Sequence, residues 1–393
     1  MKKSIKDFDL NNKKVIIRCD FNVPMRDGVI DDDSRIINSL PTIEYALKQN
    51  AKIILLSHLG RVKTEEDKKK NNLKIVADRL KELLNKEILF IDETRGEKLE
   101  QAISSMHAKD VILIQNTRYE DLDGKKESSN DEQLGKYWAS LGDIFINDAF
   151  GTIHRAHASN VGIASNINSG VGLLVENELQ QLSLLDKPEK PFVVILGGAK
   201  ISDKIGVVQS LIEKANYILI GGGMAFTFLK AQGKNIGTSV VDNDSINFAK
   251  EMLDKANDKI ILPVDVRVTK EFNNECFNHL VDIDSISEDE MGLDIGPKTV
   301  EMFKSYLTDA KTIFMNGTLG YSEFSNYVQG TKDIMEEIIN INATSILGGG
   351  DTVAAANKFN VKDKVTHAST GGGATLEYIE GVDLPGLNCI CDK

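Results

Sequence analysis

Short runs of hydrophobic residues recur along the chain, and stretches with helical periodicity separate them. In the first half the runs are 14–19 (KVIIRC), 53–56, 111–114 and 144–146, and in the second half they are 192–196 (FVVIL), 217–220, 260–262, 312–315 and 344–347. Runs this apolar are typical of strands covered on both faces. Between them, apolar residues such as Val208, Leu211 and Ile212 follow the 3.6-residue spacing of a helix after Ser202-Asp203. The alternation predicts an α/β fold with mainly parallel sheets.

The segment 173–185 (LLVENELQQLSLL) has a helical pattern that ends before Pro188 and Pro191. It is not rich in glycine or serine, so we expect a stiff hinge rather than a flexible tether. The sequence therefore predicts two Rossmann-like three-layer domains, residues 1–172 and 191–382, joined by a hinge helix over 173–190. The charge run 63–70 is expected to be a solvated loop or the start of a helix.

Length and composition fit this division. A chain of 393 residues with 41% hydrophobic and 27% charged residues is typical of a globular protein with two or three domains. Its 47 Lys and Arg against 59 Asp and Glu give a net charge of −12, which argues against binding of nucleic acid or anionic membrane. We find no membrane-spanning stretch and no secretion signal, and four cysteines are too few for a disulfide scaffold. We therefore expect a cytoplasmic protein.

Polar residues and glycines follow the predicted strands. In the first half these segments are Asp20-Phe21-Asn22, Ser57-His58-Leu59-Gly60-Arg61, Gln115-Asn116-Thr117-Arg118 and Asn147–Gly151; in the second half they are Gly197–Lys200, Gly221–Gly223, Asn316-Gly317-Thr318, Gly348–Asp351 and, after Ser369-Thr370, Gly371–Gly373. In open α/β sheets, ligands bind beyond the carboxyl ends of the strands. The sequence thus predicts a ligand site in each half.

The two halves differ in the chemistry they offer. Eight of the nine arginines lie in the first 155 residues, whereas 21 of the 31 glycines lie after residue 173. Arginine makes two-pronged contacts with phosphate and carboxylate, and glycine lets backbone amides approach a ligand closely. The first half is therefore equipped to hold an anion with side chains, and the second half to hold one with backbone.

A single glycine pair after a strand is usually a structural turn, but four glycine clusters that open onto helices favour phosphate binding. No G-x-x-x-x-G-K-[ST] and no G-x-G-x-x-G motif is present. Lys200 and Lys204 would lie one helical turn apart at a helix start, where an anion would relieve their repulsion. Asp351 follows a glycine triplet, so it could cap a helix, bind magnesium, or do both.

The arginines on four separate loops, together with polar residues at the same sheet edge, predict a pocket for a small polyanion. They are Arg35, Arg61, Arg118 and Arg155, with Asp20, Asn22 and His58. His154 and His157 are interpreted as packed structural histidines, and the Cys389-x-Cys391 pair lacks the further ligands of a metal site. A kinase for a small anionic substrate would need these features. A two-lobed ligand-binding protein without catalysis and a dehydrogenase of two α/β domains stay open as alternatives.

Eleven segments carry a family resemblance. They are RCDFNVP (18–24), DDDSRI (31–36), PTIEYAL (41–47), LLSHLGR (55–61), GDIFINDAFGTIHRAHAS (142–159), ILGGAKISDKI (195–205), IGGGMAFTFLKAQG (220–233), LPVDV (262–266), LDIGP (293–297), LGGGDT (347–352) and STGGGATLE (369–377). In these segments and in their order, the sequence resembles the phosphoglycerate kinase family along nearly its whole length.

The resemblance implies a hinge-bending glycolytic enzyme that transfers phosphate reversibly between 1,3-bisphosphoglycerate and MgADP, giving 3-phosphoglycerate and MgATP. It implies that phosphoglycerate is bound by Asp20, Phe21, Asn22, Arg35, His58, Leu59, Gly60, Arg61, Arg118 and Arg155. It implies that the nucleotide is bound by Lys204, Gly292, Asn316, Glu323, Gly349, Gly350, Asp351 and Thr352, with Asp351 towards Mg²⁺. The expected catalytic set is Arg35, Lys200, Lys204, Gly371, Gly372 and Gly373. The resemblance also implies a monomer whose tail, 383–393, packs back on the first domain.

The sequence departs from the family pattern at a few positions. They are Val62 in place of proline, Gln115 in place of glutamate, Thr117 in place of leucine, Met315-Asn316-Gly317-Thr318 in place of Trp-Asn-Gly-Pro, and Tyr321-Ser322 before Glu323 where a phenylalanine is common. The last two groups border the expected nucleoside pocket, so they bear on nucleotide preference rather than on the reaction class.

Overall fold

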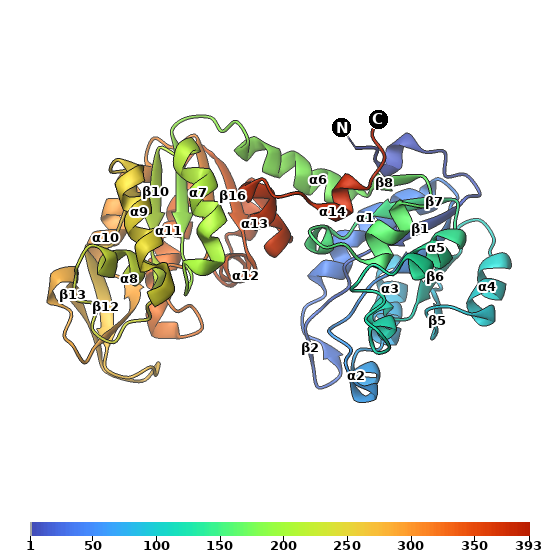
Figure 1. Ribbon diagram of the computed structural model, residues 1–393, viewed down its shortest axis with the longest axis horizontal. Helices are drawn as coiled ribbons and strands as arrows, with labels where there is room; N and C mark the ends of the chain where they lie inside the picture. The colour runs from blue at the N-terminus through green and yellow to red at the C-terminus, as the bar shows by residue number, and fades with distance from the viewer. Residues whose placement is uncertain (1) are drawn as a thin grey trace. The chain divides into compact units, whose positions relative to one another are not determined.

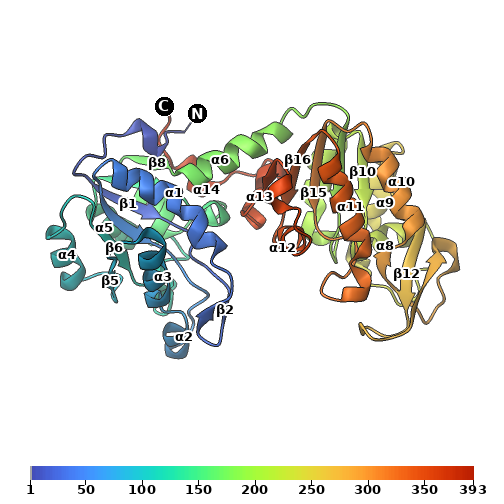
Figure 2. The ribbon, with the colours of Figure 1, turned by 180° about the vertical axis from the view of Figure 1, so that it is seen from behind.

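A computed structural model describes residues 2–393, and it divides into two compact units. The first unit runs to Gln180 and includes the C-terminal segment Asp383–Lys393, and the second is Gln181–Val382. The boundary falls inside helix α6 (Leu173–Leu182), which is followed by a 3₁₀ turn at Ser183–Leu185. Helical structure therefore ends at Leu185, and residues 186–190 of the segment expected to be a hinge helix are not helical. Figure 1 shows the chain, and Figure 2 shows it from behind.

The first unit contains a six-stranded, fully parallel sheet. Its order is β5 (Leu89–Ile91), β6 (Val111–Ile114), β4 (Lys52–Leu56), β1 (Lys14–Arg18), β7 (Ile144–Asn147) and β8 (Ser169–Val171). Its helices are α1 (Ser34–Lys48), α2 (Glu65–Lys70), α3 (Lys74–Leu84), α4 (Glu97–Ser104) and α5 (Glu132–Ser140). The strand residues that point to α1 and α3, such as Val15 and Ile17, share one core with Ile43 and Val76. Ile16, which alternates with them, packs against Gly142 just after α5.

The two ends of the chain lie side by side in the first unit (Figures 1 and 2). The backbone of Lys3 donates to Cys391 at 2.8 Å, and Lys2 pairs with Asp392. The short helix α14 (Pro385–Asn388) is held by its Gly386, whose amide donates to Ile153 at 2.8 Å and whose carbonyl accepts from Asn147 Nδ2 at 3.0 Å. The tail therefore contacts the segment that leads from β7 to Arg155.

The second unit contains another parallel six-stranded sheet and a smaller antiparallel one. The parallel order is β11 (Ile260–Ile261), β10 (Tyr217–Ile220), β9 (Phe192–Leu196), β15 (Thr312–Asn316), β16 (Thr344–Gly348) and β17 (His367–Ala368). The antiparallel order is β13 (Asn278–Asp282), β12 (Asp265–Thr269) and β14 (Met291–Ile295). The helices are α7 (Ile205–Lys214), α8 (Gly222–Ala231), α9 (Ile246–Ala256), α10 (Pro297–Leu307), α11 (Gln329–Asn340), α12 (Gly350–Lys358) and α13 (Gly373–Glu380).

The predicted α/β class with parallel sheets is confirmed, and each of the nine predicted strands is a strand. The sequence pattern missed the short edge strands β5, β8 and β17, the hairpin β2 (Met25–Arg26) to β3 (Val29–Ile30), and the whole antiparallel sheet. The charge run contains α2, which begins at Glu65 after the capping residue Thr64. Within residues 2–393, no helix combines the length and apolar character needed to cross a membrane.

Candidate active site

A cavity of about 800 Å³ in the first unit is lined by three of the predicted arginines. Arg61 follows β4, Arg118 follows β6, and Arg155 lies in the segment after β7, so segments that follow three strands of the same sheet converge on one space. Lys63 and Lys125 also line this cavity, although neither was predicted from the sequence as a site residue. A concave surface with this many cations is suited to a polyanion with phosphate groups.

Arg118 is held by its neighbours before any ligand binds. Its Nη1 donates to Asp121 Oδ2 at 3.1 Å and to Ser128 Oγ at 3.2 Å, and the Ser128 amide donates to the same carboxylate at 2.8 Å. Its Nε is buried without a partner among residues 2–393. Arg155, in contrast, is exposed, and its Nε contacts Nε2 of His154 at 3.0 Å. One arginine is thus preorganised, whereas the other can adjust.

A second group of predicted residues lies at the end of β1. Arg35, at the start of α1, forms an ion pair with Asp20, and Asn22 Oδ1 accepts from the Gly60 amide at 2.8 Å. His58 Nδ1 lies 4.0 Å from Asp20 Oδ1, so the two residues are neighbours without a hydrogen bond. These residues do not line the arginine cavity, but their loops are tied together by the Asn22–Gly60 contact.

Phe21 and Leu59 do not fit the ligand-contact role that was expected of them. Their side chains are buried in the hydrophobic core of the first unit. Their amides are also occupied, since Phe21 N donates to Ser57 Oγ at 2.8 Å and Leu59 N donates to Asn116 Oδ1 at 3.2 Å. The pattern placed them correctly at strand ends, but apolar side chains there pack inwards and hold the loops.

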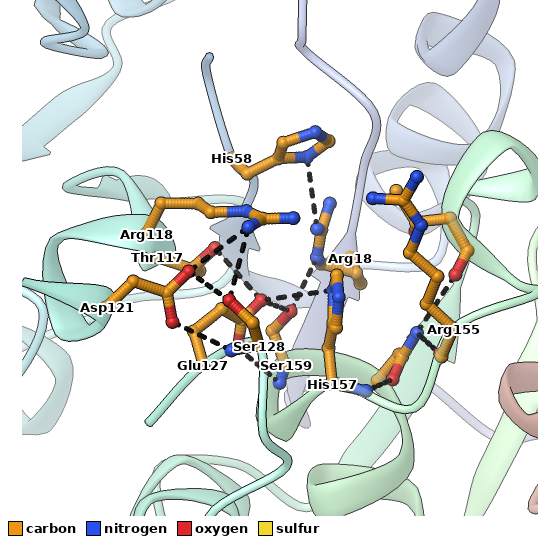
Figure 3. Close-up of polar contacts among 12 residues, drawn as sticks. Arg18, His58, Thr117, Arg118, Asp121, Glu127, Ser128, Arg155, His157 and Ser159 are labelled. Atoms are coloured by element: carbon orange, nitrogen blue, oxygen red, sulfur yellow. Dashed lines mark hydrogen bonds and ion pairs between the residues drawn. The ribbon is translucent and has the colours of Figure 1, made fainter. Parts of the chain in front are cut away.

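Two buried charged residues, neither of them predicted from the sequence as a site residue, lie beneath these loops. Arg18 ends β1, and Glu127 precedes α5. Figure 3 shows both residues, which are 1% and 0% exposed by accessible surface. Ser159 connects them, accepting from Arg18 Nε at 2.8 Å and donating to Glu127 Oε1 at 2.5 Å. The signal for Arg18 was a charged residue inside an apolar strand run, which in a buried sheet requires partners.

The histidines near this network are neutral. Burial, and then the nearby Arg18, lower the pKa of His58 well below its usual value. Burial lowers the pKa of His157 to about 3, and the buried position agrees with its interpretation as a packed histidine, although it also lines the arginine cavity. Neither imidazole therefore carries a positive charge at neutral pH.

The second unit contains a narrower cavity of about 240 Å³. Three of the predicted nucleotide residues line it: Gly292, Glu323 and Asp351. One part of its wall is apolar and aromatic, with Phe226, Phe272, Leu319 and Tyr321. The rings of Phe272 and Tyr321 meet edge to face with centroids 4.7 Å apart. The cavity therefore combines an apolar, aromatic wall with the carboxylate of Asp351 at the glycine-rich start of α12. Such a cavity suits a heteroaromatic base that is linked to phosphate.

Lys204 and Asn316 lie together at the carboxyl ends of β9 and β15. Lys204 Nζ donates to the Asn316 backbone oxygen at 3.3 Å and also to its side-chain oxygen, while Asn316 Nδ2 is buried without a partner among residues 2–393. Lys204 is the N-cap of α7, whereas Lys200 is exposed in the preceding loop. The two lysines therefore do not share a helix start as expected, because the helix begins at Ser202 with a 3₁₀ turn.

The glycine clusters of the second unit have two different structural roles. A Cβ on Gly197 would lie 2.0 Å from the Thr318 oxygen, and one on Gly222 would lie 2.8 Å from the Gly198 nitrogen. The amides of Gly198 and Gly222 already donate to backbone carbonyls. These glycines let backbone segments pack together, which corrects the expectation that their amides serve a ligand. A Cβ on Gly350 or Gly372, however, would meet nothing within 4 Å.

The glycine clusters that contain Gly350 and Gly372 therefore leave open space beside the first turns of α12 and α13. Gly349, with φ +90°, is the N-cap of α12, and Gly372, with φ +55°, is the N-cap of α13. The first amides of an α-helix lack intrahelical partners and carry partial positive charge. The side chain of Thr352 is buried, and its Oγ1 accepts from the Gly317 amide at 2.6 Å, so it holds the loop after β15.

Comparison with known proteins identifies the family of the chain. The sequence profile of the family described as phosphoglycerate kinase matches residues 5–382. The chain belongs to the phosphoglycerate kinase family. It is 58% identical over 398 residues to the phosphoglycerate kinase of Fusobacterium nucleatum and 57% identical over 394 residues to that of Listeria innocua, and each comparison covers 100% of both chains.

Solved structures agree with this membership. The phosphoglycerate kinase of Coxiella burnetii superposes with a TM-score of 0.89 at 38% identity, covering 99% of this chain and 98% of that one. The phosphoglycerate kinase of Pyrococcus horikoshii gives a TM-score of 0.86 at 30% identity, with the same coverage. The chain is thus a glycolytic phosphotransferase with a carboxyl group as acceptor, and ATP or ADP is its co-substrate. Family membership excludes the non-catalytic binding protein and the dehydrogenase.

Proposed function

We propose that the first unit binds the phosphoglycerate. The observation that carries this proposal is the convergence of Arg61, Arg118 and Arg155 on one cavity, where three guanidinium groups match a phosphate dianion. Asp20, Asn22, Arg35 and His58 form the adjoining group that would take the rest of the molecule. Phe21, Leu59 and Gly60 contribute by holding the loops, since Gly60 donates to Asn22 and the two apolar side chains are buried.

The second unit is proposed to bind the nucleotide. The apolar slot beside Phe272 and Tyr321 would take the base, Glu323 would contact the ribose side, and the open helix starts after Gly349 and Gly372 would face phosphates. Lys204 is buried with a carbonyl and an amide oxygen as its partners, so its positive charge remains available to an incoming phosphate. Gly292, Gly350, Asn316 and Thr352 shape this site.

Transfer in the direction of ATP synthesis moves a phosphoryl group from the acyl phosphate of 1,3-bisphosphoglycerate to the terminal oxygen of ADP. In reverse, the carboxylate oxygen forms a bond to the γ-phosphorus while the bond to the β–γ bridging oxygen breaks. The carboxylate is already ionised at neutral pH, so no general base is required. Charge spreads over three equatorial oxygens, and we propose that Arg35, Lys200, Lys204 and the Gly371–Gly373 amides stabilise it.

Magnesium is proposed to bind through Asp351. This carboxylate lines the nucleotide cavity, is exposed, and forms no side-chain hydrogen bond or ion pair with residues 2–393. No group of three or more His, Cys, Asp or Glu side chains within residues 2–393 could hold a metal by itself. These residues fit an ion that takes most of its ligands from nucleotide phosphates and water, as magnesium does. When bound, the ion would neutralise charge on the transferring and leaving oxygens.

Direct transfer requires the acceptor and the donor to come into contact. Because the proposed phosphoglycerate and nucleotide residues belong to different units, we propose that α6 and the residues after it act as a hinge. We also propose that the enzyme acts as a cytoplasmic monomer. Its net charge of −12 supports the further proposal that it does not bind nucleic acid.

A crossed binding experiment tests the two assignments. Arg118→Ala should weaken binding of 3-phosphoglycerate at least tenfold and leave MgATP binding unchanged, because each charge-assisted contact to phosphate contributes about 1.5–3 kcal/mol. Asp351→Asn should do the reverse, and its defect should shrink as Mg²⁺ concentration rises. Arg26→Ala, at an exposed arginine paired with Asp31, is the matched control. Loss of nucleotide binding in Arg118→Ala would contradict the division of ligands.

A further inference from the structure

Glu127 lies at the centre of a buried network under the proposed phosphoglycerate site. Its carboxylate accepts from the Ser159 amide at 2.9 Å, from Ser159 Oγ at 2.5 Å and from Thr117 Oγ1 at 3.2 Å (Figure 3). Its backbone oxygen also accepts from the Ala158 amide at 3.0 Å. Thr117 directly precedes Arg118, and Ala158 and Ser159 follow Arg155 by three and four residues. One carboxyl residue therefore joins the two segments that carry these arginines.

Arg18 extends this network to a third loop. Its guanidinium is fully buried and donates to Ser159 Oγ, to the Cys19 carbonyl and to His58 Nδ1, the last at 3.2 Å. Ser159 must accept from Arg18, so its own proton is directed to Glu127. A buried guanidinium needs a compensating negative charge, and Glu127 supplies one through this bridge. The order of residues is thus Glu127, Ser159, Arg18 and His58.

The network determines which nitrogen of His58 carries the proton. A guanidinium can only donate, so Nδ1 of His58 must accept from Arg18. The neutral imidazole then carries its proton on Nε2, which lies on the side of the ring away from Arg18 (Figure 3). His58 consequently presents an N–H donor, which is the group that an anionic ligand requires.

We propose that Glu127 is a positioning residue for the phosphoglycerate site: through Ser159 and Arg18 it fixes His58 as the Nε2–H tautomer, and through Thr117 and Ser159 it holds the segments of Arg118 and Arg155. This inference rests on the proposed binding of phosphoglycerate at these residues. Glu127 does not touch the ligand in this proposal. It acts by keeping three loops in the geometry that the ligand needs.

Glu127→Gln and Ser159→Ala test the proposal in different ways. The first keeps the shape of the side chain but removes the charge that faces Arg18, and it places an amide NH₂ among groups that are themselves donors. The second removes the hydroxyl bridge and leaves both charges. The matched control is Glu120→Gln, because Glu120 is also a buried carboxylate but pairs with Arg95 at 3.0 Å and with Thr94, outside the network.

Steady-state kinetics with 3-phosphoglycerate and MgATP give the first measurement. Glu127→Gln should raise the KM for 3-phosphoglycerate at least tenfold, and Ser159→Ala should raise it in the same direction, while the KM for ATP stays within twofold. The ring-nitrogen chemical shifts of ¹⁵N-labelled histidine give the second. His58, assigned with the variant His58→Gln, should be the Nε2–H tautomer in the unmodified enzyme and a mixture in both network variants.

A purely structural role gives a different result. In that case Glu127→Gln would lower the thermal midpoint like Glu120→Gln but leave the His58 tautomer and the KM for 3-phosphoglycerate unchanged, and the proposal would be overturned. If Glu127→Gln does not fold, Ser159→Ala decides by the same two measurements. Titration with 3-phosphoglycerate separates this inference from the proposed function. If the His58 signals do not shift with ligand but the variants change the tautomer, the ligand assignment fails, while the control of the His58 tautomer by Glu127 is confirmed.

Discussion

The ammonium group of Lys204 lies against Asn316, donating to its backbone oxygen at 3.3 Å and to its side-chain oxygen. Both oxygens are uncharged, and Lys204 forms no ion pair with a carboxylate of residues 2–393. Burial therefore lowers the pKa of Lys204 to about 8, although the charges of Asp351 and Asp203 partly oppose this shift. Lys204 is thus a buried cation without a direct anionic partner, which a bound phosphate would supply.

Nucleotide binding should depend on pH through this lysine. A bound phosphate stabilises the ammonium form and raises its pKa, so binding takes up a proton once the free enzyme has lost it. The affinity for MgATP should be constant between pH 6.5 and 7.5 and should fall towards tenfold per pH unit above about 8. Calorimetric titration at pH 7 and pH 9 measures this. Lys204→Gln should bind weakly at both values, without the additional loss at pH 9.

Arg35 and Lys204 should contribute mainly to the transition state. Arg35→Ala and Lys204→Ala should each lower kcat by about 100-fold, corresponding to roughly 3 kcal/mol, because their charges stabilise the migrating phosphoryl group. The KM values of Arg35→Ala should change little, and Lys204→Ala should raise the KM for ATP, but by a smaller factor than it lowers kcat. Initial rates over a grid of both substrates measure the two effects. A variant that keeps kcat and raises only KM would show that its residue binds ground-state substrate instead.

The sequence could predict the parts of the fold that depend on long apolar runs. All nine such runs are strands, since a strand buried on both faces needs consecutive apolar residues. In each unit, residues that follow the carboxyl ends of these strands line that unit's own cavity. Several strands that the sequence could not predict are short or exposed, whereas β12 has five mostly buried residues but interrupts them with the charged residues Asp265 and Arg267. In β13, Asn278–Asp282 has no buried residue, and β17 has two residues, so neither leaves an apolar run.

The predicted site residues were harder to interpret because spacing does not show where a side chain points. Gly197 and Gly350 stand in similar Gly-rich turns, but only the structure shows that one packs on the backbone of Thr318 and the other faces open space. The network of Glu127 could not be predicted from the sequence either, because a single glutamate in the charged stretch 120–132 resembles a solvated residue. Thr117, a departure from the family pattern, became meaningful only through its hydrogen bond to Glu127.

This difference between glycines gives a matched pair of variants. Gly350→Ala places a methyl group in open space at a helix start with ordinary φ, so stability should stay the same or rise by about 0.4–1 kcal/mol while the KM for ATP rises. Gly197→Ala places its Cβ 2.0 Å from a backbone oxygen, so it should destabilise the protein by several kcal/mol. Thermal unfolding followed by circular dichroism, with kinetics, compares the two. A strongly destabilised Gly350→Ala would contradict the open space at this helix start.

Hinge motion should be visible as compaction in solution. The proposed ligands bind to separate units, and transfer needs them to meet, so the enzyme with both 3-phosphoglycerate and a non-hydrolysable MgATP analogue should be more compact than with either alone. Small-angle X-ray scattering measures the radius of gyration in the four ligand states. An identical radius in all four states would mean that catalysis does not involve closure.

Asp148 should make the first unit less stable as pH rises. Its Oδ1 accepts from the Leu174 amide at 3.0 Å at the start of α6, while its Oδ2 is buried without a partner among residues 2–393. Burial raises its pKa from 3.8 to about 7. The folded protein therefore binds a proton that the unfolded chain releases between about pH 4 and pH 7, and the free energy of unfolding should fall across this interval.

Asp148→Asn should remove that dependence, because the amide keeps the acceptor at Oδ1 and replaces the unpaired oxygen by a neutral NH₂. Relative to the unmodified protein, it should gain up to about 4 kcal/mol between pH 4 and pH 8, an upper limit set by a shift of about three pKa units. Trp138, the single tryptophan, is buried in the first unit, so its fluorescence during urea unfolding reports this unit. Asp254→Asn, at an exposed position on α9, is the control. An unchanged pH slope in Asp148→Asn would mean that Asp148 is ionised in the folded state and that the α6 amides stabilise its charge.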